Sequence, residues 1–255
     1  MNGRLHYWIK FFQIYKNWGE ILLYRIRKRN LTKVILKNGV QFCSSSKSPL
    51  PVIVDEVFLL NRYTAFPKVK IKKGDVVIDI GAHAGVFSVF ASVSGASQIF
   101  SYEPDPDNYK YILKNCANNN ISNIFPRNLA VTGSSKQINL YLNESAVRNS
   151  VFSESQNLNK GGVIKVKSIT LQKIFLNEKI KKIDFLKMDC EGSEGLIIRS
   201  TPIKILEKIG KISMEYHNRV SPLNHLAIRE KLKIAGFSVK ILKFDNYLGY
   251  IYAWR

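Results

Sequence analysis

The stretch VVIDIGAHAG, residues 76–85, decides how this chain of 255 residues is expected to fold. Its first five residues form the β-branched, apolar run that a strand needs when both faces of a parallel sheet are covered. Gly81 and Gly85 follow, and glycine lets a backbone turn tightly and approach a ligand closely. A second apolar run ends at Tyr102-Glu103-Pro104. A carboxylate there can accept hydrogen bonds from both hydroxyls of a ribose, so the two segments together predict a nucleoside-cofactor site.

Strands and helices are expected to alternate around this stretch. Apolar runs predict strands at 76–80 and 98–102, helical patterns follow at about 85–94 and 106–119, and further apolar runs lie at 123–131, 183–188 and 211–215. This alternation predicts an α/β fold with a parallel sheet covered by helices. Near the end, runs at 237–244 and 248–254 predict an antiparallel hairpin that closes the sheet.

The first 50 residues predict an extension of a different kind. Apolar residues recur at intervals of three and four from Leu5 to Ile26 and predict one amphipathic helix, which packs on the main domain or lies on a membrane surface. A β-hairpin is expected next, because Asn38-Gly39 is the dipeptide most suited to a type I′ turn. We therefore expect a basic extension over residues 1–50 and one catalytic domain over residues 51–255.

The net charge of +20 is distributed unevenly along the chain. Residues 1–50 hold ten Lys or Arg against one acid, whereas residues 51–110 hold six against seven. A basic surface favours acidic partners such as phosphorylated sugars, anionic lipid or nucleic acid, and compositional drift is the alternative explanation. Hydrophobic residues at 45% of the chain exclude a disordered protein.

The three cysteines, at positions 43, 116 and 190, form no CxxC pair. This spacing argues against a zinc site or a disulfide framework and favours a reducing compartment. No apolar run reaches the roughly 18 residues that are needed to span a bilayer, and the start lacks the cleavage pattern of a signal peptide. We expect a cytoplasmic protein.

The glycine spacing separates two kinds of nucleoside cofactor. A dinucleotide site needs G-x-G-x-x-G, so that the backbone can approach a pyrophosphate. Here His83 holds the second glycine position and Val86 the third. The D-x-G-x-x-x-G pattern that is present better suits S-adenosylmethionine, whose amino-acid tail can meet Asp79 and the loop amides. An ordinary tight turn between a strand and a helix is the alternative at this point.

Several segments, taken in order, resemble the FkbM-like methyltransferases, which depend on S-adenosylmethionine. They are EVF at 56–58, YT at 63–64, DIGAHAG at 79–85, YEP at 102–104, LKN at 113–115, NLAV at 128–131 and, most specific of all, IDFLKMDCEGSE at 183–194. The resemblance covers roughly residues 53–217. It implies a class I methyltransferase fold, Rossmann-like, with a seven-stranded and mostly parallel sheet, an antiparallel last strand and helices on both faces. His83 departs from the family, which more often has Asn there, but both residues can donate to a ligand.

The residues expected to bind S-adenosylmethionine follow the ends of the predicted strands. They are Asp79, Gly81, Ala82, His83, Gly85, Glu103, Pro104, Asn128, Ala130 and Asp189. Ala130 is expected near the adenine ring, although plain sheet packing explains its apolar neighbours equally well. The polar stretch at 142–162, which includes Arg148, could be a lid on the acceptor side or a solvated loop.

Four residues are candidates for catalysis. Asp189 and Glu191 follow a buried run, so they should lie at the end of a central strand beside the transferable methyl group. Glu215 and His217 end the next strand, where His217 could take the acceptor's proton while Glu215 holds its imidazole. The alternatives are a capping role for Glu191, which Glu194 fits better, and a plain surface histidine. No metal ligand is assigned, although divalent metal at these four side chains stays open.

These patterns predict a cytoplasmic O-methyltransferase that methylates a hydroxyl of a sugar, a glycan or glycolipid precursor, or a related metabolite. The acceptor class comes from the resemblance alone. An RNA methyltransferase using the basic surface is the main alternative, followed by a non-catalytic cofactor or interaction domain and by a NAD-dependent oxidoreductase. The expected partner is a small-molecule or glycan acceptor, and the basic amino-terminal arm could also contact an anionic membrane.

Overall fold

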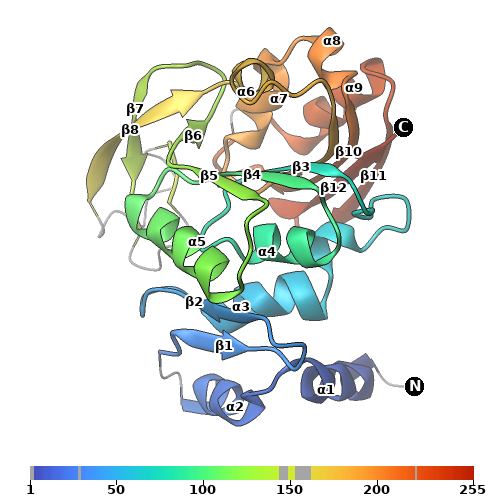
Figure 1. Cartoon of the computed structure of the whole chain (residues 1–255). Coiled ribbons are helices and arrows are strands. Elements are labelled where there is room, and N and C mark those ends of the chain that lie inside the picture. The colour runs from blue at the N-terminus through green and yellow to red at the C-terminus, as the bar shows by residue number, and fades with distance from the viewer. Residues whose placement is uncertain (1–2, 28–29, 144–148, 153–161, 222) are drawn as a thin grey trace.

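A seven-stranded sheet forms the centre of the computed structural model, which describes residues 3–27, 30–143, 149–152, 162–221 and 223–255 (Figure 1). Its strand order is β11-β12-β10-β9-β3-β4-β5. The bounds are β3 Val76–Ile80, β4 Gln98–Tyr102, β5 Ile124–Arg127, β9 Ile183–Met188, β10 Ile209–His217, β11 Ser238–Lys243 and β12 Leu248–Trp254. Only β12 runs antiparallel to both of its neighbours. The predicted fold class is therefore confirmed.

Helices cover both faces of this sheet. On one face lie α4 Val86–Val93 and α5 Pro106–Asn118, and on the other lie α6 Leu171–Asn177, α7 Glu194–Ser200, α8 Ile203–Leu206 and α9 His225–Ile234 (Figure 1). Successive side chains of β3 enter opposite cores, because Val77 packs beneath α4 and Ile78 packs on the other side. Both cores are largely apolar, so the strands in the middle of the sheet are rich in hydrophobic residues, with Asp79 and Lys187 as buried exceptions.

The run at 123–131, predicted as one strand, is divided between two sheets. After β5 the chain turns at Asn128, whose side-chain amide donates to the carbonyls of Glu103 and Pro104 at 2.9 and 3.0 Å. The next strand, β6 Ala130–Val131, pairs instead with β8 Val163–Ile169, and β8 also pairs with β7 Gln137–Tyr141. This three-stranded sheet stands beside the carboxyl end of β5.

The predicted single amino-terminal helix is wrong, because the structure has two helices there. They are α1 Gly3–Ile14 and α2 Trp18–Arg27. A hairpin of β1 Lys33–Ile35 and β2 Gln41–Cys43 follows them. The backbone between the two helices pairs with the end of β1 and the residues just after it: Lys16 N–H donates to Ile35 O and Lys37 N–H donates to Ile14 O, both at 2.8 Å. These groups cannot serve the helix and the hairpin at once, so the helix breaks at Tyr15.

The hairpin itself is confirmed, but its turn is not the expected type I′. That turn needs a positive φ at both central residues, whereas Gly39 has a φ of +91° and Asn38 is not among the described residues with positive φ. The loop instead closes through Leu36, which accepts from Gly39 N–H at 3.1 Å and donates to Val40 O at 2.8 Å.

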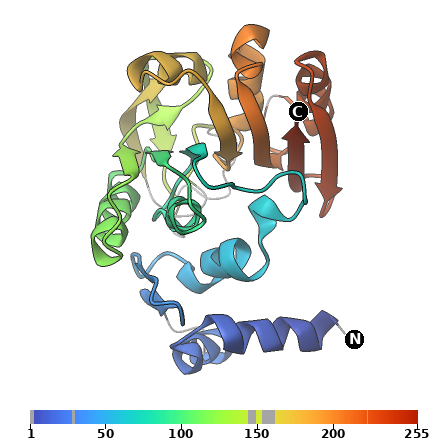
Figure 2. The same cartoon turned by 45° about the vertical axis from the view of Figure 1, so that its right-hand side comes forward.

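The amino-terminal extension shares a core with the central sheet. Phe11, Tyr15 and Phe42 are fully buried in the same cluster as Val77 and Phe87. A polar contact joins the two parts as well, because the Tyr15 hydroxyl donates to Asp55 Oδ1 at 2.6 Å. Asp55 opens a π-helical turn, Asp55–Leu59, that follows α3 Leu50–Val54. Viewed as in Figure 2, α1 lies along the base of the molecule, beneath the helices that cover the sheet. No helix among the described residues is long and apolar enough to cross a membrane.

Candidate active site

A cavity of about 310 Å³ lies at the carboxyl ends of β3, β4, β9 and β10. Ligands of open α/β sheets bind at this edge. The loop after β3 forms one wall, and the π-helical turn after α3 forms another through Glu56 and Val57. Asn149 and Val151 line the cavity from the stretch between β7 and β8. Most of the segment predicted as a lid, including Arg148, lies outside the described residues.

The loop after β3 passes very close to the end of β9. Gly81 has a φ of +72°, and a Cβ built on it would lie 1.8 Å from the carbonyl oxygen of Asp189. Only glycine fits such a backbone approach. The amides of Gly81 and Ala82 both donate to the carbonyl of Tyr102, at 3.0 and 3.1 Å. The loop is therefore held against both neighbouring strands.

A buried ion pair supports this loop from below. Lys187 Nζ lies 3.1 Å from Asp79 Oδ1 and donates to the carbonyl of Gly81 at 2.6 Å. The other carboxylate oxygen of Asp79 accepts from the Ser88 hydroxyl at 2.6 Å. Asp79 is fully buried and does not line the cavity. The expected contact of Asp79 with a ligand therefore does not match its position, because its carboxylate is turned toward Lys187 behind the loop.

Glu103 lies where the sequence placed it, at the end of β4 and in the cavity wall. One carboxylate oxygen accepts from the backbone N–H of His83 at 2.8 Å and the other accepts from that of Asp105 at 3.0 Å. Each oxygen keeps a further lone pair for a ligand. Burial raises the pKa of Glu103 to about 7, against the lowering effect of these two amides.

His83 faces the same cavity and has unmet hydrogen-bonding capacity. Both of its ring nitrogens are buried and have no hydrogen-bond partner among the described residues. Burial, and then the charge of Lys187, lowers the pKa of His83 to about 4, so the ring is neutral at pH 7. A neutral imidazole offers one donor and one acceptor. Because buried polar groups are nearly always paired, these two atoms indicate a polar ligand in the cavity.

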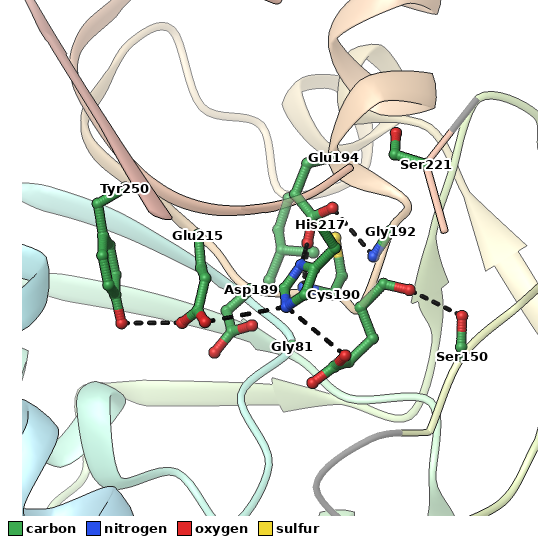
Figure 3. Close-up of polar contacts among 12 residues, drawn as sticks. Gly81, Ser150, Asp189, Cys190, Gly192, Glu194, Glu215, His217, Ser221 and Tyr250 are labelled. Atoms are coloured by element: carbon green, nitrogen blue, oxygen red, sulfur yellow. Dashed lines mark hydrogen bonds and ion pairs between the residues drawn. The ribbon is translucent and has the colours of Figure 1, made fainter. Parts of the chain in front are cut away.

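Several carboxylates line the cavity near the ends of β9 and β10, and Figure 3 shows two of them, Asp189 and Glu215, beside His217. Asp189, Glu191, Glu215 and Glu56 all line the cavity. Burial, and then the charge of Asp189, raises the pKa of Glu56 to about 7 and that of Glu215 to about 8. Tyrosine hydroxyls hold two of the four in place, since Tyr63 donates to Asp189 at 2.6 Å and Tyr250 donates to Glu215 at 2.8 Å.

His217 stands behind these carboxylates and is held mainly by Glu194, not by Glu215 as expected. Its Nδ1 lies 3.2 Å from Glu194 Oε1, whereas its Nε2 lies 3.5 Å from Glu191 and 3.9 Å from Glu215 (Figure 3). Burial lowers the pKa of His217, but the charges of Glu194 and Glu191 outweigh it and raise the pKa well above its usual range. The ring is therefore an imidazolium at neutral pH and, contrary to the role expected of His217, cannot take the acceptor's proton in that form.

Glu194 also fixes the turn after β9. Its carboxylate accepts from the amides of Cys190 at 2.8 Å and Gly192 at 3.0 Å, which belong to the turn before α7 and not, as expected, to the helix itself. Glu191 is thereby left in a left-handed conformation, with a φ of +50°. One ligand atom from each of Asp189, Glu191 and His217 lies within 4.8 Å of the others. A divalent metal at these three residues would require His217 to lose its proton, because an imidazolium has no lone pair to offer a metal.

Most of the predicted site residues meet at the cavity, and some stand behind it. Gly81, Ala82, His83, Glu103, Pro104, Ala130, Asp189, Glu191 and Glu215 line it, whereas Asp79, Gly85, Asn128 and His217 do not. Gly85 serves as the N-cap of α4 with a φ of +79°. Sequence reasoning assigned no role to Glu56, Tyr63 or Lys187. All three stand in segments that carry the family resemblance, and Lys187 carried a second signal, because a lysine inside an otherwise apolar strand needs a buried partner.

The chain is similar to several known methyltransferases. A model of the methyltransferase FkbM domain matches residues 79–239. A curated tRNA (guanine(37)-N(1))-methyltransferase from Aedes aegypti is 41% identical over 51 residues, which are 20% of this chain and 9% of that protein.

The crystal structure of methyltransferase FkbM from Methylobacillus flagellatus KT has a TM-score of 0.53 at 11% identity. The match covers 98% of this chain and 58% of that one. TrmK of M. capricolum, solved with S-adenosyl-homocysteine, has a TM-score of 0.45 at 12% identity and covers 78% and 67%. This chain spans less than two thirds of the length of the Aedes aegypti protein and of the Methylobacillus flagellatus KT protein.

Proposed function

We propose, because the chain belongs to the FkbM methyltransferase family, that it transfers a methyl group from S-adenosylmethionine to a hydroxyl of a sugar, a glycan or glycolipid precursor, or a related metabolite. The observation that supports S-adenosylmethionine as the cofactor is that Glu103 and His83 line the same cavity. Glu103 offers acceptors for the two ribose hydroxyls, and His83 offers a donor and an acceptor that lack partners in the part of the chain that the structure describes. The sulfonium group supplies an electrophilic methyl when it is bound.

The acidic side of the cavity supports an alcohol as the acceptor. When the acceptor oxygen forms its bond to the methyl carbon, the carbon–sulfur bond breaks and the hydroxyl proton must leave. Asp189 and Glu191 are the carboxylates placed to take that proton, and His217 lies next to Glu191. Tyr63 keeps Asp189 in one orientation. Holding the reacting groups in line can supply on the order of 7–11 kcal/mol of the barrier reduction.

Cofactor affinity should fall in acid because of Glu103. The carboxylate that accepts both ribose hydroxyls is lost as the pH drops through about 7. If the ligand binds the ionised form, the Kd for S-adenosylmethionine should rise about tenfold per pH unit below that value. Calorimetric titrations between pH 5 and 8 measure this. Glu103→Gln is the matched control, which should bind weakly and without the pH dependence. An unchanged wild-type Kd across this range would contradict the assignment.

The reaction itself is tested by labelled methyl transfer into a fractionated cell extract. Label that is released by glycosidases and resists nucleases supports a sugar acceptor. Asp189→Asn should slow transfer roughly a hundredfold, since that is a typical contribution of a positioned base, while calorimetry still detects cofactor binding. Asp107→Asn, at a carboxylate that is 79% exposed, should keep the wild-type rate. Full transfer by Asp189→Asn would overturn the catalytic assignment.

RNA is the second candidate acceptor. The net charge of +20 and the local likeness to a tRNA methyltransferase favour it. Phosphate contacts would make such binding weaken steeply with salt. In the same extract, label that disappears after nuclease treatment would identify RNA and would refute the sugar acceptor.

A further inference from the structure

The first helix carries an apolar face that the protein leaves about half exposed. Leu5, Trp8, Ile9 and Phe12 of α1 are between 39% and 54% exposed. At about 100° per residue they fall within an arc of roughly 100°, beside the separate face that is buried through Phe11. A soluble surface helix normally directs charged residues to that arc. This helix is therefore apolar on two faces, and only one of them is used in the fold.

The exposed face continues onto the second helix through ring contacts. Phe12 lies 6.2 Å from the ring of Trp8 and 5.3 Å from that of Trp18, the first residue of α2. Farther along α2, Leu23 is 48% exposed and Ile26 is 70% exposed. Together these seven residues, Leu5, Trp8, Ile9, Phe12, Trp18, Leu23 and Ile26, are called the aromatic base. They lie on the helices at the end of the molecule farthest from α6 and α9 (Figure 1).

Basic side chains accompany the aromatic base. Lys16, Arg27, Lys33 and Lys37 are all exposed. Two of them lie beside the joint between α1 and α2, since Lys37 N–H donates to Ile14 O and Lys33 O accepts from the Asn17 side chain. Glu20 is the single acid in the first 50 residues of the sequence. Trp, Phe and Leu side chains next to lysine and arginine match the lipid-facing and headgroup-facing surfaces of a helix that lies in a membrane interface.

We propose that the aromatic base docks this protein on the surface of an anionic lipid bilayer. The apolar side chains enter the boundary between headgroups and acyl chains, and the lysines face the phosphates. A second copy of the chain is disfavoured as the occupant, because a two-fold interface would bring the same lysines of both copies together. Single-stranded RNA is disfavoured too, because its bases stack on flat rings and Leu5, Ile9 and Ile26 offer none.

Vesicle sedimentation of the full chain tests this docking without any cofactor or acceptor, so its result is independent of the reaction proposed above. The chain should partition onto phosphatidylcholine vesicles that contain phosphatidylglycerol at least about tenfold more strongly than onto pure phosphatidylcholine vesicles. Added salt should weaken the binding. The emission of Trp8 and Trp18 should shift to the blue on binding, and this shift should be lost in a Trp8→Phe, Trp18→Phe variant, where Trp254 remains as an internal reference.

Two sets of variants locate the surface. Trp8→Ser with Phe12→Ser should reduce partitioning at least tenfold, since each removes an aromatic side chain from the bilayer. The matched control is Leu176→Ser with Ile234→Ser, which removes apolar side chains that are 69% and 75% exposed on the opposite side of the sheet. This control should bind like the wild type. If Trp8→Ser with Phe12→Ser binds vesicles like the wild type, the proposal is wrong. It is also wrong if the wild type forms a dimer or binds RNA through this surface, which would be seen as loss of the dimer or of the RNA complex in that double variant.

Discussion

Gly81→Ala is expected to lower the free energy of unfolding by roughly 4 kcal/mol or more, because the backbone conformation and the packing both exclude a side chain. The new methyl group would meet the carbonyl of Asp189 at 1.8 Å in a residue whose φ is +72°. The carbonyl is backbone in the centre of the sheet edge, so it cannot swing aside as the tip of a flexible side chain could. Relief requires the loop after β3 to separate from β9.

Gly74→Ala separates the loss of stability that comes from the left-handed backbone from the loss that comes from the steric clash. Gly74 has a similar φ of +87°, but nothing lies within 4 Å of a Cβ built on it. Its substitution should therefore cost only the left-handed strain, about 1–2 kcal/mol. Urea unfolding followed by circular dichroism measures both variants. Equal losses would mean that the close approach of Gly81 to Asp189 does not exist in solution.

Lys187→Met should cost on the order of 3–5 kcal/mol of folding free energy, because it leaves a fully buried carboxylate without its cation. Asp79 is 0% exposed, and Lys187 is its ion-pair partner at 3.1 Å. The same substitution removes the donor to the carbonyl of Gly81. Methionine fills a similar volume, so the loss reports on charge and hydrogen bonding more than on a cavity.

Removing the carboxylate as well should recover part of that loss. Asp79→Asn keeps an oxygen that can accept from Ser88 but carries no charge, so the double variant Asp79→Asn, Lys187→Met should be more stable than Lys187→Met alone. Lys110→Met breaks an ion pair whose side chains are 72% and 79% exposed, and it should leave the unfolding midpoint unchanged. A double variant that is less stable than Lys187→Met would contradict a buried charge as the cause.

The sequence predicted the middle of the sheet and the hairpin near the carboxyl end better than the amino-terminal end of the chain. The strands at 76–80, 98–102 and 183–188 are found with the predicted bounds, because strands that are buried on both faces are rich in apolar residues. The break at Tyr15 could not be foreseen from helical periodicity, since it depends on pairing with residues about twenty positions later. Local patterns do not report which distant backbone groups compete for the same hydrogen bonds.

In the candidate site as well, the positions of residues at strand ends were predictable, whereas contacts with partners from other segments were not. Residues on loops directly after strands, such as Glu103 and Asp189, line the cavity because strand ends fix where they lie. The partner of His217 could not be chosen from sequence, because Glu191, Glu194 and Glu215 all come within 4 Å of its ring. Glu194 is the carboxylate that accepts from backbone amides, and it can do so because the chain turns at Glu191, which has a left-handed conformation. Asp79 was misplaced for a related reason, since its buried partner Lys187 lies on another strand.

The common core of the extension and the sheet has a practical consequence for anyone who wants a shorter fragment for crystallisation. A cut at residue 50 looks attractive on charge and composition, but it would strip Phe11, Tyr15 and Phe42 away from the cluster that contains Val77 and Phe87. Asp55 would also lose the Tyr15 hydroxyl and the Arg25 guanidinium. The truncated protein would expose to solvent the apolar side chains that Phe11, Tyr15 and Phe42 now cover. A shorter fragment should therefore be made by deleting surface loops, with the first helix kept.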